Sequence, residues 1–316
     1  MSEALLEAVG LCRDYPARSG SGGKARAVDG VDLRVEAGEA FGIVGSSGAG
    51  KSTLARLLLA LEVPDAGSVH FDGQPISAMA PRRVRPLRRR FQAVFQDPLA
   101  SLDPRLSVGT IVSEPLVAFR VGTPAQRRAR VAELLALVDL PEDAARRFPS
   151  AFSGGERQRI AIARAMALEP ELLILDEPVS FLDVSIRGQI LKLLSDLRDR
   201  YALTMVFISH DLRVVGDVCD HIAVLLHGAI VEQGPTRPLL QHPAHPYTEA
   251  LVAATPLLDP SWRPPPFQSP HHENWPEGAC RYASSCRAAS PACREEPALI
   301  SIHDERHVRC WHPIDS

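Results

Sequence analysis

The chain has 316 residues, 45% of them hydrophobic, and a formal net charge of −3. This length and composition predict one large globular domain with a smaller one, and exclude a disordered chain. The near-neutral charge gives no general case for nucleic-acid binding. No apolar run approaches the ~20 residues that a membrane-spanning helix needs, and the first residues lack the pattern of a signal peptide, so we expect a soluble, non-exported protein.

The first 40 residues predict short strands. Residues 28–35 alternate apolar and polar side chains before a turn at residues 37–39. Tyr15 lies in this region, and an aromatic ring there either stacks on an adenine or packs against its neighbours.

Residues 45–53, GSSGAGKST, predict a phosphate-binding loop. They follow the apolar run 40–44 and precede a helix-like segment, which is the context that the pattern G-x-x-x-x-G-K-[ST] requires. We expect Lys51 to reach the β- and γ-phosphates and Ser52 to bind Mg²⁺. The full set of predicted loop contacts is Gly45, Ser46, Ser47, Gly48, Ala49, Gly50, Lys51, Ser52 and Thr53.

Gln96 follows the apolar residues 93–95 and precedes a loop with a proline at position 98. A neutral amide at a strand end can bind Mg²⁺ or the attacking water through its oxygen. The alternative is a glutamine that only forms hydrogen bonds within its loop.

A second anion-binding segment is predicted after a helical region at residues 105–150. Ser153, Gly154, Gly155 and Glu156 begin an apolar helix, where a hydroxyl, free amides and the helix dipole can face a phosphate. Since the chain has one nucleotide loop, a second such helix start suggests that two chains share each nucleotide. An ordinary helix N-cap is the alternative.

Two further strands end in groups suited to hydrolysis. Residues 171–178, ELLILDEP, predict a buried parallel strand that ends at Asp176, a Mg²⁺ ligand, and Glu177, a base for the attacking water. Residues 204–209 predict another strand, and His210 after it can contact the γ-phosphate or the water. Taken alone, His210 would more often be a core histidine.

In this order the motifs resemble the ATP-binding cassette (ABC) family over about residues 5–255. The resemblance rests on GSSGAGKST, Gln96, the signature FSGGERQR, LLILDE, the D-loop at residues 180–183 and His210. It implies an α/β P-loop NTPase fold with a RecA-like parallel-sheet core, an N-terminal antiparallel β subdomain and a helical signature subdomain at about residues 105–165. It also implies a head-to-tail dimer in which the signature and Asp183 of one cassette face ATP held by the other.

Every hydrolytic position of that pattern is occupied, so the resemblance implies an active ATPase. Ser46 stands where members of the family often carry Glu, and Phe181 stands where the D-loop often has Ala. Phe181 could alter packing across the dimer.

Two further stretches resemble the ATPase subunits of dipeptide, oligopeptide and nickel importers. They are residues 95–105, FQDPLASLDPR, and residues 245–248, HPYT, and the segment after the phosphate loop resembles the F-type chain of such pairs. The resemblance implies two permease subunits, a second related ATPase or a second copy, an external substrate-binding protein, and a peripheral place on the cytoplasmic face of the inner membrane.

The last residues form a separate region, so we divide the chain into an ATPase domain, 1–255, and an extension, 256–316, with a proline-rich linker and four cysteines. These are Cys280, Cys286, Cys293 and Cys310. Four thiolates suit Zn²⁺ or a 4Fe-4S cluster, and the spacing is not the C-x2-C of structural zinc sites. Because several importer ATPases that the tail resembles carry a 4Fe-4S cluster, we predict a cluster, with zinc or no metal as alternatives.

The sequence thus predicts a membrane-associated ATPase that powers import of di- or oligopeptides. One alternative is an ATPase with the same role whose importer carries nickel, glutathione or opines. Another is a non-transport cassette such as that of the carbon–phosphorus lyase complex. A DNA- or ribosome-acting cassette is disfavoured, since the chain lacks duplicated cassettes, a long coiled-coil insertion and a basic excess.

Overall fold

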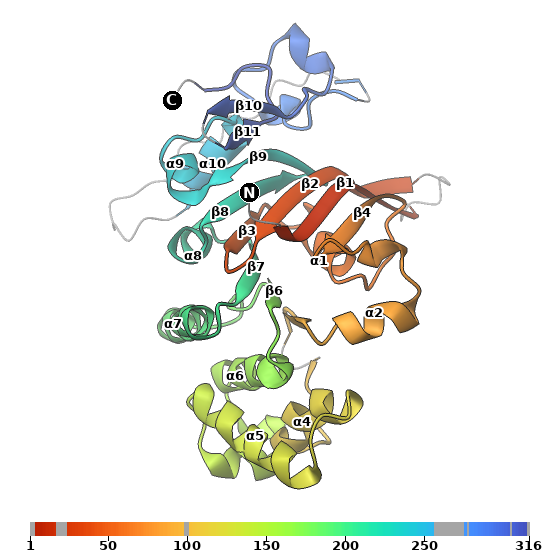
Figure 1. Ribbon diagram of the computed structural model, residues 1–316. Coiled ribbons are helices and arrows are strands. Elements are labelled where there is room, and N and C mark those ends of the chain that lie inside the picture. Colours follow the sequence, from red (N-terminus) through yellow and green to blue (C-terminus); the bar gives the residue numbers. More distant parts are fainter. Residues whose placement is uncertain are drawn as a thin grey trace.

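The computed structural model (Figure 1) describes residues 4–16, 24–97, 101–255, 275–276, 278–303 and 305–314. Within these ranges the chain forms a three-stranded and an eight-stranded sheet with helices around the larger one. The predicted proline-rich linker, residues 262–267, lies outside the described residues. The strands are β1 (Ala4–Pro16), β2 (Lys24–Glu36), β3 (Ala40–Val44), β4 (Ala66–Phe71), β5 (Phe91–Val94), β6 (Leu172–Asp176), β7 (Thr204–Ser209), β8 (His221–Leu226), β9 (Ala229–Pro235), β10 (Ile300–His303) and β11 (Arg306–Val308).

The larger sheet has the order β10-β11-β9-β8-β3-β7-β6-β5. Its strands β5, β6, β7, β3 and β8 are parallel, whereas β9, β11 and β10 join antiparallel. The smaller sheet is antiparallel, with the order β2-β1-β4. The predicted α/β fold, with a parallel core and an N-terminal antiparallel part, is confirmed. The N-terminal strands are longer than the short ones predicted, because β1 and β2 stay paired along their whole length through several register shifts.

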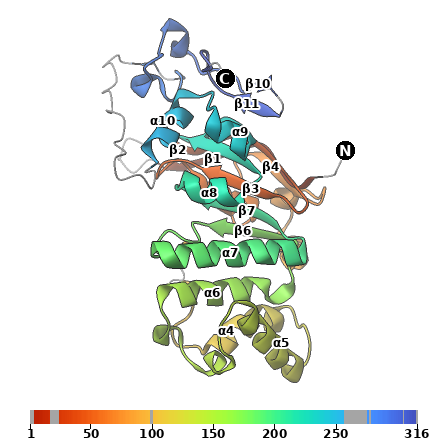
Figure 2. The same ribbon diagram turned by 90° about the vertical axis from the view of Figure 1, so that its left-hand side faces the viewer.

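Helices flank the larger sheet, and Figure 2 shows α7 and α6 one below the other beneath β6, with α4 and α5 beyond α6, away from the sheet. They are α1 (Lys51–Leu58), α2 (Pro81–Leu87), α4 (Val108–Ala118), α5 (Pro124–Leu137), α6 (Gly154–Ala165), α7 (Val184–Tyr201), α8 (Leu212–Val218), α9 (Thr236–Gln241) and α10 (Pro246–Ala254). Short 3-10 turns are η1 (Ile76–Ala78), η2 (Glu142–Arg146), η3 (Pro149–Ala151), η4 (Met166–Leu168), η5 (Ala283–Ser285) and η6 (Pro291–Arg294). The helical prediction for residues 105–150 is thereby confirmed.

Two hydrophobic cores lie on the two faces of the larger sheet. Successive side chains of β6 alternate between the two cores: Leu173 and Leu175 pack in one, whereas Leu172 and Ile174 pack in the other. Because both faces are buried, the strand is an uninterrupted apolar run, and its first charged side chain comes at its carboxyl end. The carboxyl ends of β3, β6 and β7 therefore bring the predicted polar groups to one edge of the sheet.

Candidate active site

The loop between β3 and α1 holds the predicted phosphate-binding residues. Its last residue, Gly50, has a φ of 104°, and a Cβ on its first residue, Gly45, would lie 2.3 Å from the carbonyl oxygen of Leu225. Glycine is therefore required at Gly50 for its backbone conformation and at Gly45 for close packing. The remaining predicted contacts lie in the loop or in the first turn of α1: Ser46, Ser47, Gly48, Ala49, Lys51, Ser52 and Thr53.

Lys51 is buried and folds back over this loop. Its Nζ donates hydrogen bonds to the carbonyl oxygens of Gly45, at 2.9 Å, and Ser46, at 3.0 Å. Burial lowers the pKa of Lys51, and the charges of Glu177 and Asp176 oppose that shift. The ammonium group thus lies between the loop and the two carboxylates that end β6.

Asp176 and Ser52 form a pair of oxygen groups suited to Mg²⁺. The Ser52 hydroxyl donates a hydrogen bond of 3.4 Å to Asp176 Oδ1, and Asp176 is 7% exposed. Burial raises the pKa of Asp176, and the hydrogen bond from Ser52 opposes that rise. A hard divalent cation favours the ionised carboxylate and takes oxygen ligands, so these residues fit the predicted magnesium.

Glu177 has a φ of 50°, a left-handed conformation that is uncommon outside glycine. Its backbone N–H donates to the carbonyl oxygen of Ile208 at 2.9 Å. Its carboxylate accepts a 2.5 Å hydrogen bond from the Ser180 hydroxyl, and His210 Nδ1 lies 2.8 Å from the same oxygen. The other oxygen lies 3.9 Å from Lys51 Nζ. The structure therefore brings Glu177, His210 and the phosphate loop together.

The two other residues predicted beside the nucleotide have different surroundings. Gln96 is exposed, just beyond the end of β5. Tyr15 is half-buried, its hydroxyl donates a 2.5 Å hydrogen bond to Glu62, and the guanidinium of Arg13 lies 5.1 Å from its ring centre. Packing thus accounts for the placement of Tyr15, and its stacking on adenine stays a prediction.

The predicted second anion site forms the N-terminus of α6. Ser153 is the N-cap, and its hydroxyl and backbone N–H exchange hydrogen bonds with the backbone N–H and carboxylate of Glu156. The backbone N–H and the hydroxyl of Ser153 both donate to the Glu156 carboxylate, and these two bonds lower its pKa. Figure 1 places α6 with α4 and α5, away from α1. Within the described residues, the helix start therefore does not face the chain's own phosphate loop.

Asp183 is exposed and precedes the first residue of α7. It stands between Phe181, which is 73% exposed, and Val184, which is 80% exposed. Two exposed apolar side chains thus flank Asp183 along the chain.

The four cysteines of the extension gather in one region, although no disulfide joins those the structure describes. Burial and the nearby thiols of Cys280, Cys286 and Cys293 raise the pKa of Cys310 to about 11. Among the described residues, however, no group of three or more His, Cys, Asp or Glu is arranged to hold a metal ion. The zinc alternative therefore gains no support from the geometry, and the 4Fe-4S cluster is likewise unsupported and stays a prediction.

Sequence reasoning missed one contact of the phosphate loop. The backbone N–H of Ser46 donates a 3.0 Å hydrogen bond to the hydroxyl of Tyr247, some 200 residues further along the chain. The HPYT stretch was the available signal, but it indicated only a family relationship. A local pattern does not reveal which distant element its side chains contact.

A search of the described residues for helices that could span a membrane finds none of sufficient length and apolar character.

The fold and this site define an ATPase of the P-loop class. Residues 28–180 match the ABC transporter family, and residues 231–293 match the oligopeptide/dipeptide transporter C-terminal region. The chain belongs to the ATP-binding proteins of the ABC transporter family.

Individual relatives cover nearly the whole chain. The probable peptide ABC transporter ATP-binding protein y4tS of Sinorhizobium fredii is 44% identical over 98% of this chain and 90% of its own length. The dipeptide transport ATP-binding protein DppF of Haemophilus influenzae is 40% identical over 98% of this chain and 96% of its own. Among solved structures, the dimeric bacterial ABC transporter cassette MJ0796 is 29% identical, with a TM-score of 0.67 over 73% of this chain and 99% of that one.

Proposed function

We propose that the chain powers an importer of di- or oligopeptides by hydrolysing ATP. The observation that carries the proposal is the match of residues 231–293 to the C-terminal region of oligopeptide and dipeptide transporters. It is supported by relatives named for peptide and dipeptide transport that align along almost the entire chain. The chain would bind two permease subunits and a second ATPase, and receive cargo through an external binding protein, on the cytoplasmic face of the inner membrane.

The proposed catalytic roles concern residues at the ends of β5, β6 and β7 and in the phosphate loop. Asp176 and Ser52, with Gln96, would hold Mg²⁺, which neutralises charge on the β- and γ-phosphates. Glu177 would accept the proton of the attacking water, and Lys51 would exchange its bonds to Gly45 and Ser46 for the phosphates.

The remaining roles concern the nucleotide and its dimer. His210, 2.8 Å from Glu177, would orient that carboxylate or the water. Ser153, Gly154, Gly155, Glu156 and Asp183 would face ATP held by the partner cassette.

Replacement of Glu177 by glutamine tests the role of the base. The variant removes the proton acceptor but keeps the size of the side chain, so ATP turnover is expected to fall about 100-fold or more while ATP binding is retained. Glu171→Gln is the matched control, because Glu171 is exposed and pairs with Arg90 on the surface. Turnover of Glu177→Gln at close to the wild-type rate would refute the role.

Uptake by whole cells tests the cargo. A strain that lacks this chain is expected to lose uptake of a radiolabelled dipeptide, and to regain it with the wild-type chain but not with Glu177→Gln. Uptake of radioactive nickel is measured in the same strains, and its loss in place of dipeptide uptake would favour the alternative that the cargo is nickel. Purification of the tagged chain from detergent-solubilised membranes should recover two permeases and a second ATPase. Recovery from the soluble fraction alone would exclude the importer.

We also propose that the extension holds a 4Fe-4S cluster on Cys280, Cys286, Cys293 and Cys310. It is argued from four cysteine thiols that lie near one another in the extension and from the preference of such clusters for four thiolates. A cluster would cross-link separate turns of the extension. Anaerobically purified protein should then absorb broadly near ~400 nm and contain iron. Protein without either would exclude the cluster.

A further inference from the structure

Tyr247 and Lys51 fix the two ends of one peptide group in the phosphate loop. The peptide between Gly45 and Ser46 has its N–H bonded to the Tyr247 hydroxyl at 3.0 Å and its carbonyl oxygen bonded to Lys51 Nζ at 2.9 Å. If Lys51 turned to a phosphate, the bond to Tyr247 would remain to hold the orientation of this peptide. A loop held in its binding conformation loses less entropy when a ligand binds.

Tyr247 is itself held by its own helix start. It is 7% exposed, and its backbone N–H donates to Nδ1 of His245, the N-cap of α10, at 2.9 Å. Burial lowers the pKa of His245 to about 4, so the neutral imidazole is available as the acceptor near neutral pH. The backbone N–H of His245 in turn donates to the fully buried Glu232. Hydrogen bonds to buried groups therefore hold the backbone from which the Tyr247 side chain extends.

The cysteine-bearing extension packs directly against this surrounding. The ring of Tyr282, which lies between Cys280 and Cys286 in the sequence, has its centre 5.4 Å from that of Tyr247 and 6.0 Å from that of His245. Such tilted pairs are favourable aromatic contacts. The contact places a residue of the extension one side chain away from the phosphate loop.

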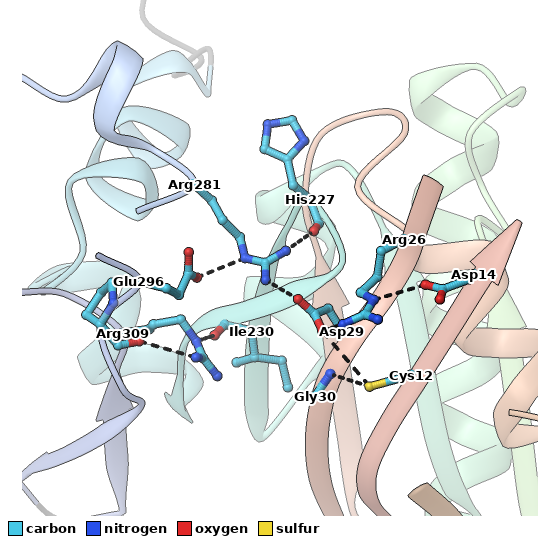
Figure 3. Close-up of polar contacts among 11 residues, drawn as sticks. Cys12, Asp14, Arg26, Asp29, Gly30, His227, Ile230, Arg281, Glu296 and Arg309 are labelled. Atoms are coloured by element: carbon cyan, nitrogen blue, oxygen red, sulfur yellow. Dashed lines mark hydrogen bonds and ion pairs between the residues drawn. The ribbon is translucent and has the colours of Figure 1, made fainter. Parts of the chain in front are cut away.

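A second path from the extension reaches the other end of the loop (Figure 3). Arg281 contacts Asp29 and the carbonyl oxygen of His227, and also pairs with Glu296 at 2.9 Å. The backbone N–H of Asp29 donates to the carbonyl oxygen of Gly228 at 2.9 Å, and the Gly228 N–H donates to the carbonyl oxygen of Ala49 at 2.8 Å. Consecutive residues of the extension thus support both ends of the phosphate loop.

We propose that Tyr247 is a positioning residue for the phosphate loop, and that Tyr282 of the extension holds it in place. The C-terminal extension then sets the affinity for ATP from within the same chain. This inference concerns ATP binding by the cassette and does not depend on the identity of the cargo or on a metal in the extension.

Replacement of Tyr247 by phenylalanine tests the first step, because it removes the hydroxyl and keeps the ring. In the full-length chain, the dissociation constant of a non-hydrolysable ATP analogue with Mg²⁺ is expected to rise about two- to tenfold, the value of one hydrogen bond. The KM for ATP should rise in proportion while kcat stays within about twofold.

Thr248→Val is the matched control. Thr248 is the next residue of α10, is fully buried, and has no hydrogen-bond partner for its hydroxyl among the described residues. This variant should leave the affinity for the analogue unchanged. An unchanged affinity in Tyr247→Phe, or an equal change in both variants, would overturn the proposal.

The second step is tested at Tyr282. Tyr282→Ala removes the ring contact and should weaken analogue binding, whereas Tyr282→Phe keeps the ring and should bind as the wild type does. Because both residues act on one hydrogen bond, Tyr282→Ala should add little to the effect of Tyr247→Phe in the double variant. Wild-type affinity in Tyr282→Ala, or fully additive effects, would show that the extension does not act through Tyr247.

Discussion

Glu177 shows what a motif reveals about a residue and what it leaves out. The stretch LLILDE predicted its place after a buried strand, beside the carboxylate of Asp176. The motif did not predict its φ of 50° or the 2.5 Å hydrogen bond from Ser180. A left-handed conformation outside glycine costs free energy that the surrounding contacts must offset, and such conformations gather at functional sites. The sequence therefore predicted which residue would end the strand, but not its backbone conformation or the contacts that hold its side chain, because these depend on the folded chain.

The pair of His221 and Glu39 gives a pH-dependent contribution to stability. His221 Nδ1 lies 2.7 Å from Glu39, and this hydrogen bond raises the pKa of His221. A raised pKa in the folded state means that the contribution is full below the unfolded pKa of about 6.5 and is lost as pH rises through the folded pKa. His221→Gln should therefore lower the Tm more at about pH 6 than at about pH 9.

His227→Gln serves as the control, since His227 is exposed and its side chain forms no ion pair among the described residues. Differential scanning fluorimetry across this pH range measures both variants. A loss of Tm in His221→Gln that does not vary with pH would contradict the prediction.

At the scale of helices and strands, prediction succeeded for two strands whose pattern is local. The buried strands β6 and β7 are apolar runs with both faces covered, and the sequence predicted both. It did not predict β8 or β9, although β8 is likewise a buried apolar run. It also missed β10 and β11, whose four and three residues carry too little pattern. Their formation depends on β9, which pairs with β11 from about 75 residues upstream.

The N-terminus of α6 also depends on such a long-range contact. A Cβ on Gly155 would lie 2.4 Å from Cγ2 of Ile186 in α7, whereas one on Gly154 would lie 3.6 Å from the nearest atom of Leu182. Glycine at position 155 therefore lets α6 pack against α7. The sequence indicated two glycines at a helix start and gave no means of separating their roles.

Replacing these glycines by alanine should separate them. Gly155→Ala is expected to lower the free energy of unfolding by about 1–3 kcal/mol, the usual cost of overpacking. Gly154→Ala makes an ordinary contact and should be neutral or slightly stabilising, because alanine favours a helix. Urea unfolding of the two variants measures the difference. Equal midpoints would mean that α7 moves to accommodate the added methyl group.

At the scale of the whole molecule, the extension and the ATPase sheet are joined by a buried ion pair. Arg306 of β11 is 6% exposed and donates to the fully buried Glu232 of β9 at 3.0 Å. Glu232 also accepts the backbone N–H groups of Ala244 and His245, at 2.9 Å each. The division at residue 255 that the sequence predicts stays a prediction, and across it the two parts share one sheet and one buried carboxylate.

Replacement of Arg306 by methionine should therefore destabilise more than the extension. The variant leaves Glu232 buried without its cation, at an expected cost of about 3–5 kcal/mol. Arg105→Met is the matched control, because the Arg105 side chain is 86% exposed in its pair with Asp103, and an exposed ion pair contributes little to stability. Thermal unfolding is followed by two signals, the fluorescence of a bound nucleotide analogue for the ATPase and circular dichroism for the whole chain.

If both signals shift together to lower temperature in Arg306→Met, the extension and the ATPase unfold as one unit through the sheet that they share. A circular dichroism transition at lower temperature, with the nucleotide fluorescence lost at the wild-type temperature, would mean that the extension unfolds alone. The ion pair would then not stabilise the ATPase.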